Sequence, residues 1–301
     1  MNKIYDLIRT FKPNIKDITI TAYTQNITKL MKLLELNEND INGLFKKLED
    51  KQNIYNLLQD RNYTTIRNFY NGVIVILQAT DPNSNILKEY ITDRDNYNKQ
   101  YQQEALSNEP SKKQRRNWIN IDDVNDTIEY WRNKDIQKYM LLSLFVKYPF
   151  RNNLRNMEII RYTKYRTLDQ DDKVERNFFI IHKKGVYELA FNDYKTFRTY
   201  GEKRFTITDP YLIKDLTHYL KQTKKTSYLF TAPNGSFFTS NAFTKYVNSI
   251  FINYEDKRIG TTLLRHILIS DALGEVSKIQ NALSNIYGHS TDTQSGYIKH
   301  I

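Results

Sequence analysis

The hydrophobic residues of the first third of the chain recur at the spacing of amphipathic helices. After Thr19, where Asp17 or Thr19 can serve as N-cap, one stripe runs through Ile20, Tyr23, Ile27, Leu30, Met31 and Leu34. Similar helical patterns follow over residues 39–50, 52–60, 62–81 and 86–106. The sequence therefore predicts a helical domain over residues 1–106.

A polar, basic segment interrupts this pattern at residues 107–118, "SNEPSKKQRRNW". Proline and small polar residues favour a break in regular structure, so we interpret the segment as a linker. Its cations are Lys112, Lys113, Arg115 and Arg116. They could contact a phosphate backbone, although each one singly is equally compatible with a solvated charged loop.

Beyond the linker the pattern becomes mixed, and residues 119–301 form the second predicted domain. Further helices are expected over residues 121–134, 135–149, 152–159, 209–223, 241–254, 261–273 and 276–288. Strands are expected over residues 177–184, 186–196 and 203–208, with Gly185 and Gly201 at turns. The predicted fold class is mainly α with a small antiparallel β-sheet (α+β).

The charge balance favours a polyanionic partner. The 301 residues include 45 Lys and Arg against 34 Asp and Glu, for a net charge of +11 and a pI near 9.4. Residues 1–116 hold 18 basic and 14 acidic side chains, so the excess is not confined to one tail. Nucleic acid is the leading candidate partner, and a basic surface that only confers solubility is the alternative.

The absence of cysteine excludes disulfides and thiolate zinc sites. The five histidines, 182, 218, 266, 289 and 300, have no metal-ligand spacing. The chain has neither a signal-peptide pattern at its start nor a run of about 18 apolar residues. We expect a soluble, unexported protein with no membrane partner.

Five residues could together break a DNA strand without a metal. Such chemistry needs a nucleophile, cations that neutralise the phosphate oxygens and an acid that protonates the leaving 5′-oxygen. The candidates, in chain order, are Arg151 in "KYPFRNNLRNMEI", Lys195 in "FNDYKTFRTYG", Arg265 in "TTLLRHILIS", His289 after Gly288, and Tyr297. Each alone has an ordinary structural explanation, but their joint order and setting favour a catalytic interpretation.

This constellation resembles the active site of the tyrosine recombinase (phage integrase) family, which breaks and rejoins DNA. Arg151 resembles the first arginine of the family, Lys195 its hairpin lysine, and Arg265 the second arginine in its usual "LRH" setting. The Gly-His pair at His289 is followed after eight residues by Tyr297, which resembles the nucleophile. The residues of these motifs are most similar to those of recombinases of large DNA viruses, their satellite viruses and mobile elements.

The resemblance implies a helical core-binding domain followed by a catalytic domain, which clamp double-stranded DNA between them. It implies that Arg151, Arg265 and His289 hold the phosphate, that Tyr297 forms a 3′-phosphotyrosyl link, and that Lys195 protonates the released 5′-hydroxyl. It also implies that neither a metal nor ATP nor another cofactor is required. A homotetramer on two duplexes is the family's working assembly.

One position departs from the family pattern. Three residues before the second arginine the family usually has His or Lys, whereas this chain has Thr262. A hydroxyl is a poor base near neutral pH, which leaves the general base unassigned. His266 could substitute, but adjacent helical residues project about 100° apart, which favours a structural hydrogen bond for His266.

Three alternatives remain open at this point. The carboxylates of "IDDVND" and "DQDD" could belong to a metal-dependent nuclease, although helix starts and turns commonly contain Asp. A type IB topoisomerase would share the phosphotyrosyl chemistry and relax supercoiled DNA. A non-catalytic or catalytically impaired DNA-binding relative would be consistent with Thr262.

Overall fold

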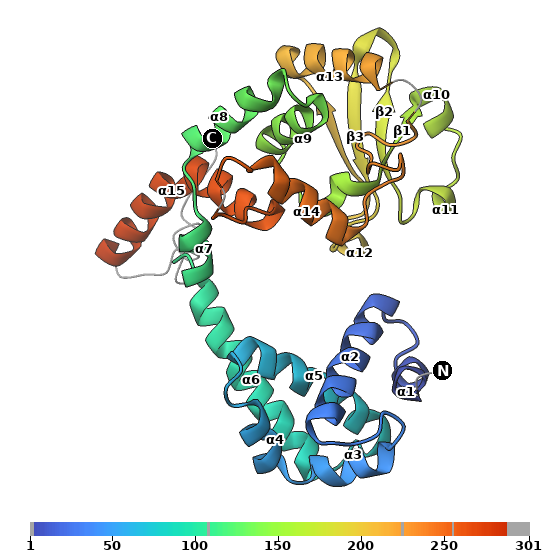
Figure 1. Ribbon diagram of the computed structural model, residues 1–301, viewed down its shortest axis with the longest axis vertical. Coiled ribbons are helices and arrows are strands. Elements are labelled where there is room, and N and C mark those ends of the chain that lie inside the picture. The colour runs from blue at the N-terminus through green and yellow to red at the C-terminus, as the bar shows by residue number, and fades with distance from the viewer. Residues whose placement is uncertain (1–2, 107–108, 224–225, 255, 288–301) are drawn as a thin grey trace. The chain divides into compact units, whose positions relative to one another are not determined.

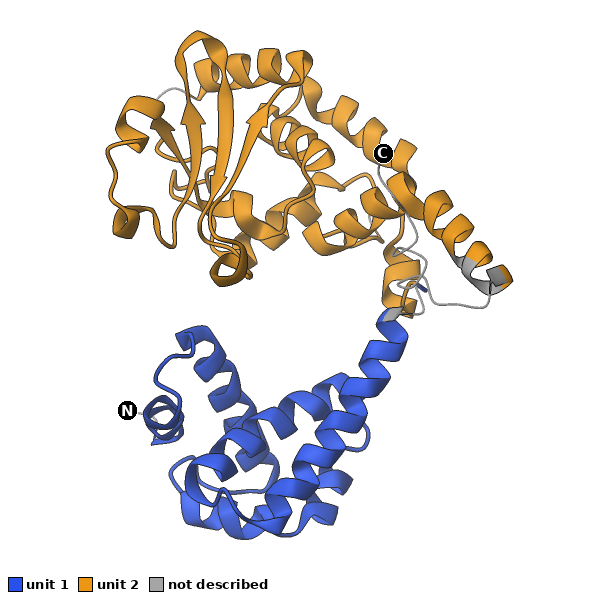
Figure 2. Cartoon of the chain, turned by 180° about the vertical axis from the view of Figure 1, so that it is seen from behind, with its two compact units in different colours: residues 1–109 blue, residues 110–301 orange. Residues whose placement is uncertain are grey.

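The computed structural model describes residues 3–106, 109–223, 226–254 and 256–287 (Figure 1). The chain divides into two compact units, residues 1–109 and residues 110–301 (Figure 2). Each unit has its own hydrophobic core. No described helix is both long and apolar enough to cross a lipid bilayer.

Unit 1 is helical throughout its described residues. Its helices are α1 (Lys3–Phe11), α2 (Asp17–Leu33), α3 (Ile41–Leu48), α4 (Lys51–Leu58), α5 (Tyr63–Thr80) and α6 (Asn85–Leu106). The four expected patterns and the stripe after Thr19 therefore correspond to α2 through α6. Helix α1 was not predicted, and it contributes the fully buried Ile4 and Ile8 to the core.

Short polar side chains begin several of these helices. Asp40, Asp50 and Asn62 each accept a hydrogen bond from the backbone N–H three residues ahead, at 2.8 to 3.0 Å. Helix α5 lies at the centre of the unit, with a row of buried aliphatic side chains from Val73 to Leu77. The N-caps and the buried α5 explain why this sequence forms a helical bundle.

Unit 2 combines helices with one four-stranded sheet. Its longer helices are α7 (Lys112–Asn117), α8 (Ile121–Arg132), α9 (Ile136–Lys147), α13 (Pro210–Gln222), α14 (Ser240–Ile250) and α15 (Thr261–Tyr287). Its strands are β1 (Met157–Arg161), β2 (Asn177–Ile181), β3 (Tyr187–Phe191) and β4 (Lys203–Ile207). Short helical turns are η1 (Asn152–Asn156), α10 (Tyr162–Tyr165), α11 (Gln170–Lys173), η2 (Lys183–Gly185) and α12 (Phe197–Tyr200). The expected class, mainly α with a small sheet, is confirmed.

The sheet is mixed rather than purely antiparallel. The strand order is β1-β2-β3-β4, with β1 parallel to β2 and the other neighbours antiparallel. A helix was expected over residues 152–159, but only Asn152–Asn156 form a helical turn, η1, and β1 begins at Met157, so the expectation was wrong for the last three residues. The backbone of β1 instead pairs with β2 on one side, and on the other exchanges hydrogen bonds with Ser227 and Leu229 at 2.9 and 2.8 Å.

Alternation along the strands separates the two faces of the sheet. Phe179 and Leu189 face the main core of the unit, which also receives α9, α13 and α14. Phe178, Ile180 and Ala190 face the opposite side, where Tyr165 of α10 covers them. Strands β2 and β3 are therefore buried on both faces, which is why they are apolar almost throughout, whereas exposed residues alternate along β4.

The segment expected as a linker is largely part of unit 2. Ser111 caps α7 together with Gln114, whose side chain accepts a 2.8 Å hydrogen bond from the Ser111 backbone N–H. At the other end the side-chain oxygen of the buried Asn117 accepts a 2.6 Å bond from the backbone N–H of Arg258. The ammonium of Lys257 donates to the carbonyl of Trp118 at 2.8 Å. Residues 110–118 are thus folded onto unit 2.

Helix α15 replaces the two helices expected over residues 261–273 and 276–288. It runs without interruption from Thr261 to Tyr287. The expected break lay at Gly274, but one glycine in a helix costs only about 1 kcal/mol, which the rest of the helix offsets. The result is a single helix that carries Arg265 in its second turn.

Candidate active site

The backbone around Arg151 is anchored through the residue that precedes it. After α9 ends, the Phe150 ring stacks on Tyr148, with ring centroids 5.9 Å apart, and packs against Phe191 of β3 at 4.4 Å and Phe205 of β4 at 5.2 Å. Arg151 comes next, immediately before η1, and its side chain is exposed. The aromatic cluster therefore fixes the backbone position of Arg151, while its guanidinium group stays exposed and open to a ligand.

Arg265 is half-buried on α15, and its charge is not neutralised. Its Nε is buried without a hydrogen-bond partner, and neither it nor Arg151 forms an ion pair with any residue that the structure describes. Burial, and after it the positive charge of Arg151, lower the pKa of Arg265. Two arginines far apart in the sequence therefore lie close enough to repel each other. An unpartnered pair of guanidinium groups is suited to bind an anion.

A direct hydrogen bond ties the two arginine-bearing segments together. The hydroxyl of Thr261, the buried first residue of α15, donates to the side-chain oxygen of Asn152 at 2.5 Å. Asn152 follows Arg151, and its amide group also donates to Ser240 at 3.4 Å. Sequence reasoning missed Asn152 and Thr261, because an asparagine and a threonine at a helix start are ordinary capping residues.

Lys195 lies on the connection between β3 and β4, four residues beyond the end of β3 and just before α12. Its side chain is exposed. Two residues earlier, Asp193 accepts hydrogen bonds from η1, through its carbonyl from Asn153 at 3.0 Å and through its carboxylate from Arg155 at 3.2 Å. The segment that carries Lys195 is therefore held against the segment that follows Arg151.

Thr262 and His266 are exposed on α15 near Arg265. Thr262 lies one turn before Arg265, which places the two residues on neighbouring positions of the helix surface. His266 makes no hydrogen bond to the described part of the chain, so the structural hydrogen bond expected for it is not formed there. His289 and Tyr297 lie outside the described residues.

The expected DNA-binding residues Lys112, Lys113, Arg115 and Arg116 all belong to α7 and are exposed. The Nε of Arg115 donates to the carbonyl of Pro110 at 2.8 Å. Because α7 is attached to unit 2 by Asn117 and Lys257, these cations have a fixed position on that unit. They lie within the six residues of one helix.

The carboxylates considered as a metal site lie at two helix starts. Asp123 completes a capping box with Asn120 at the start of α8, and Asp171 and Asp172 occupy the first turn of α11. Among residues 3–106, 109–223, 226–254 and 256–287, no group of three or more acidic or histidine side chains is arranged to hold a metal ion.

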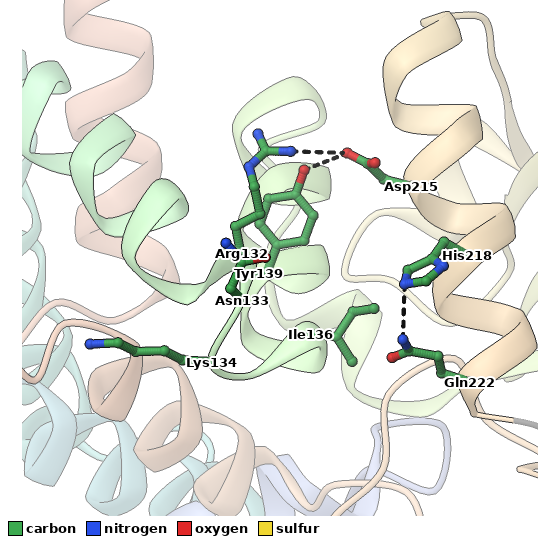
Figure 3. Close-up of a pocket in the computed structure, with 8 residues that line it drawn as sticks. All are labelled: Arg132, Asn133, Lys134, Ile136, Tyr139, Asp215, His218 and Gln222. Atoms are coloured by element: carbon green, nitrogen blue, oxygen red, sulfur yellow. Dashed lines mark hydrogen bonds and ion pairs between the residues drawn. The ribbon is translucent and has the colours of Figure 1, made fainter.

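A separate cleft of about 450 Å³ lies between the α8–α9 turn and α13 (Figure 3). In it Tyr139 donates to Asp215, Arg132 lies 3.9 Å from the same carboxylate, and His218 contacts Gln222 at 2.8 Å. None of the candidate catalytic residues lines this cleft. Arg132 and Asp215 in it are paired with each other, so the cleft is distinct from the arginine pair.

Comparisons with known proteins give distant structural similarities only. No protein-family model matches the chain, and no curated protein matches it. One similar solved structure is the crystal structure of XerA recombinase, at 14% identity and a TM-score of 0.36, covering 100% of this chain and 94% of that chain. Another is XerH site-specific recombinase bound to difH substrate in a pre-cleavage complex, at 15% identity and a TM-score of 0.43, covering 99% and 91%.

Proposed function

We propose that this protein is a site-specific tyrosine recombinase that cleaves and rejoins DNA through a covalent phosphotyrosyl intermediate. The observation that carries the proposal is the hydrogen bond from Thr261 to Asn152, which joins the segments that bear Arg265 and Arg151, two guanidinium groups that no described carboxylate neutralises. Holding like charges together in a half-buried site is unfavourable unless an anion binds between them. A scissile phosphate is that anion.

In the proposed reaction Arg151, Arg265 and His289 donate hydrogen bonds to the non-bridging phosphate oxygens. The Tyr297 oxygen attacks phosphorus and its proton passes to water, while the bond from phosphorus to the 5′-oxygen breaks. Lys195 gives a proton to that 5′-oxygen. The energy of the broken bond is retained in the 3′-phosphotyrosyl link, so a 5′-hydroxyl from a second strand reverses the step without ATP or a metal.

Both units are proposed to recognise the duplex, and within unit 2 helix α7 takes part. The four cations Lys112, Lys113, Arg115 and Arg116 are assigned to the phosphate backbone, where they supply affinity without reading sequence. We further propose that the enzyme works as a homotetramer on two duplexes and that it integrates or excises a viral or mobile genome. Residues 1–106 serve as the core-binding domain and residues 119–301 as the catalytic domain.

The test is covalent trapping on a nicked suicide substrate, in which the cleaved fragment diffuses away and rejoining cannot occur. Wild-type protein is expected to accumulate a DNA-linked species, and Tyr297→Phe is expected to form none. Arg265→Ala should reduce the trapping rate by about 100-fold or more, because a preorganised charge partner of the transition state is lost. Equal and negligible trapping by the wild type and Tyr297→Phe would refute the catalytic proposal.

Two other functions share parts of this site. Thr262, in place of a base, favours a catalytically impaired DNA-binding relative, which would bind DNA in the trapping assay without forming a covalent species. A type IB topoisomerase would trap but would relax any supercoiled plasmid. A recombinase would join two DNAs only where both carry its site.

A further inference from the structure

The start of β2 holds a buried asparagine whose side chain has no role in the reaction described above. Asn177 is the first residue of β2 and is 0% exposed. It lies opposite Met157 of β1 and Phe191 of β3, at the end of the sheet nearest to η1 and the β3–β4 connection. A polar side chain is costly in such a place unless its hydrogen bonds are satisfied.

The amide of Asn177 is fully used, and its bonds join two separate segments. Its nitrogen donates to the carbonyls of Asn153 in η1 and of Asp193 beyond β3, both at 3.2 Å. Its oxygen accepts from the backbone N–H groups of Asn192 and Asp193, at 3.0 and 2.9 Å. A carbonyl oxygen and an NH₂ group offer just this combination of acceptor and donors, which neither Asp nor Leu can reproduce.

These two segments carry two of the proposed catalytic residues. Asn153 lies two residues after Arg151, and Asp193 lies two residues before Lys195. The Asn153 side chain adds a second link, since it donates to the Asp193 carbonyl at 3.0 Å. We propose that Asn177 is a positioning residue, which fixes the Lys195 segment against the Arg151 segment so that the acid and the phosphate clamp meet at one phosphodiester. This inference rests on the function proposed above.

Loss of the Asn177 amide should displace Lys195 more than Arg151. The Arg151 segment keeps two other attachments, the packing of Phe150 on the sheet and the bond from Thr261 to Asn152. The β3–β4 connection is held to η1 by hydrogen bonds of the Asn177 and Asn153 side chains and by the ion pair between Arg155 and Asp193. A displaced Lys195 would slow protonation of the leaving 5′-oxygen while the phosphate is still bound.

The experiment compares two suicide substrates that differ in one atom. In one, the scissile phosphate is bonded to the usual 5′-oxygen. In the other, sulfur replaces that oxygen, so that the phosphorus–sulfur bond breaks and a thiolate leaves without needing a proton. Asn177→Asp retains the size of the side chain but removes both donors. Asn153→Ala removes one link between the segments and is the milder change. It tests the proposal if Asn177→Asp does not fold.

Both variants are expected to cleave the oxygen substrate about 10- to 100-fold more slowly than the wild type, the range for a misplaced catalytic group. They should cleave the sulfur substrate at close to the wild-type rate. Gln137→Glu is the matched control, because it removes amide donors from a comparable hydrogen-bond centre whose bonds run to Thr231 and Tyr246. It should lower thermal stability and leave the ratio of the two rates unchanged.

The failure of this inference differs from the failure of the proposed function. If the folded Asn177→Asp or Asn153→Ala protein loses the same factor of activity on both substrates, Asn177 is a structural residue only. The same conclusion follows if activity is unchanged on both substrates. If the wild type forms no covalent species with either substrate, the proposed function itself is wrong, and the inference falls with it.

Discussion

At the scale of single residues, the informative feature is what surrounds Arg265. A lone surface arginine is ordinarily solvated or paired with a carboxylate, whereas Arg265 has a buried, unpartnered Nε and Arg151 as its charged neighbour. The lowered pKa has the same origin, since burial and a like charge both disfavour the protonated form. The site is therefore prepared for an anion.

A simple inorganic anion should detect this preparation. At a sulfate concentration tenfold above its dissociation constant, binding would stabilise the protein by about 1.4 kcal/mol and raise the melting temperature of unit 2 by about 3 to 5 °C. Sulfate also stabilises proteins nonspecifically, so the shift in melting temperature is compared between two variants. Arg265→Ala should lose most of the shift in differential scanning fluorimetry, and Arg132→Ala, whose ion pair runs to Glu129, should keep it. An equal shift in both variants would contradict an anion site at the arginine pair.

Thr262 offers a gain-of-function test. Thr262→His would place an imidazole one helical turn before Arg265, where its neutral form can accept the proton of the attacking phenol. Because that form dominates only above an ordinary histidine pKa of about 6.5, the cleavage rate should rise between pH 5.5 and 7.5. The measurement is the single-turnover trapping rate across this range. Thr262→Gln, similar in size but not titratable, should show no such rise, and a flat profile for Thr262→His would argue against a base at this position.

At the scale of elements, two helical glycines should respond to alanine in opposite ways. A Cβ on Gly72 of α5 would lie 3.2 Å from the Ile27 side chain and 3.3 Å from the Tyr23 carbonyl, so these atoms of α2 would have to move away by a few tenths of an ångström. Gly72→Ala should lower the free energy of unfolding of unit 1 by about 1 to 3 kcal/mol. Gly274 of α15 has no atom within 4 Å of such a Cβ, and Gly274→Ala should stabilise unit 2 by up to about 1 kcal/mol. Chemical denaturation of both variants checks the signs. Destabilisation by Gly274→Ala would contradict the open surroundings of Gly274, and an unchanged free energy of unfolding in Gly72→Ala would contradict the close packing of α2 against α5.

The sequence predicted most elements but not all of their connections. Helices with a clear apolar stripe, such as α2 and α5, were placed within two or three residues, because their burial and their periodicity coincide. Strand β1 was missed because Leu154, Met157 and Glu158 are compatible with a helix, and its pairing with β2 and residues 227–229 joins segments that are distant in the sequence. Pairing of this kind leaves no local pattern.

The same limit applies to the candidate site. Arg151, Lys195 and Arg265 could be proposed from their order and from resemblance to a family. The groups that position them, Asn152, Thr261 and Asn177, are small polar residues at element ends, where such residues are common for local reasons. Only their partners across the fold distinguish them from ordinary caps.

At the scale of the whole molecule, the boundary between the units has a measurable consequence. Because α7 is part of unit 2, a fragment of residues 119–301 should be less stable than one of residues 110–301. The loss should be about 1 to 3 kcal/mol, since the Arg258 backbone N–H would lose its buried acceptor on Asn117. Urea denaturation of the two fragments measures the difference. Replacing Lys112, Lys113 and Arg116 with Gln in the longer fragment should leave stability nearly unchanged, and equal stability of the two fragments would make residues 110–118 a linker after all.

The unbroken length of α15 limits how a tyrosine at position 297 could meet Arg265. At a rise of 1.5 Å per residue, the 22 positions from Arg265 to Tyr287 separate their Cα atoms by about 33 Å. Ten further residues, even fully stretched, cover at most about 33 to 36 Å. A phenol on the same chain would therefore have to return along most of that length, less the reach of the two side chains, unless the end of α15 unwinds, whereas one supplied by a second molecule is free of that tether. Mixing Arg265→Ala with Tyr297→Phe should then restore strand cleavage that neither variant performs alone, and a mixture as inactive as its components would mean that each chain folds its tail back on itself.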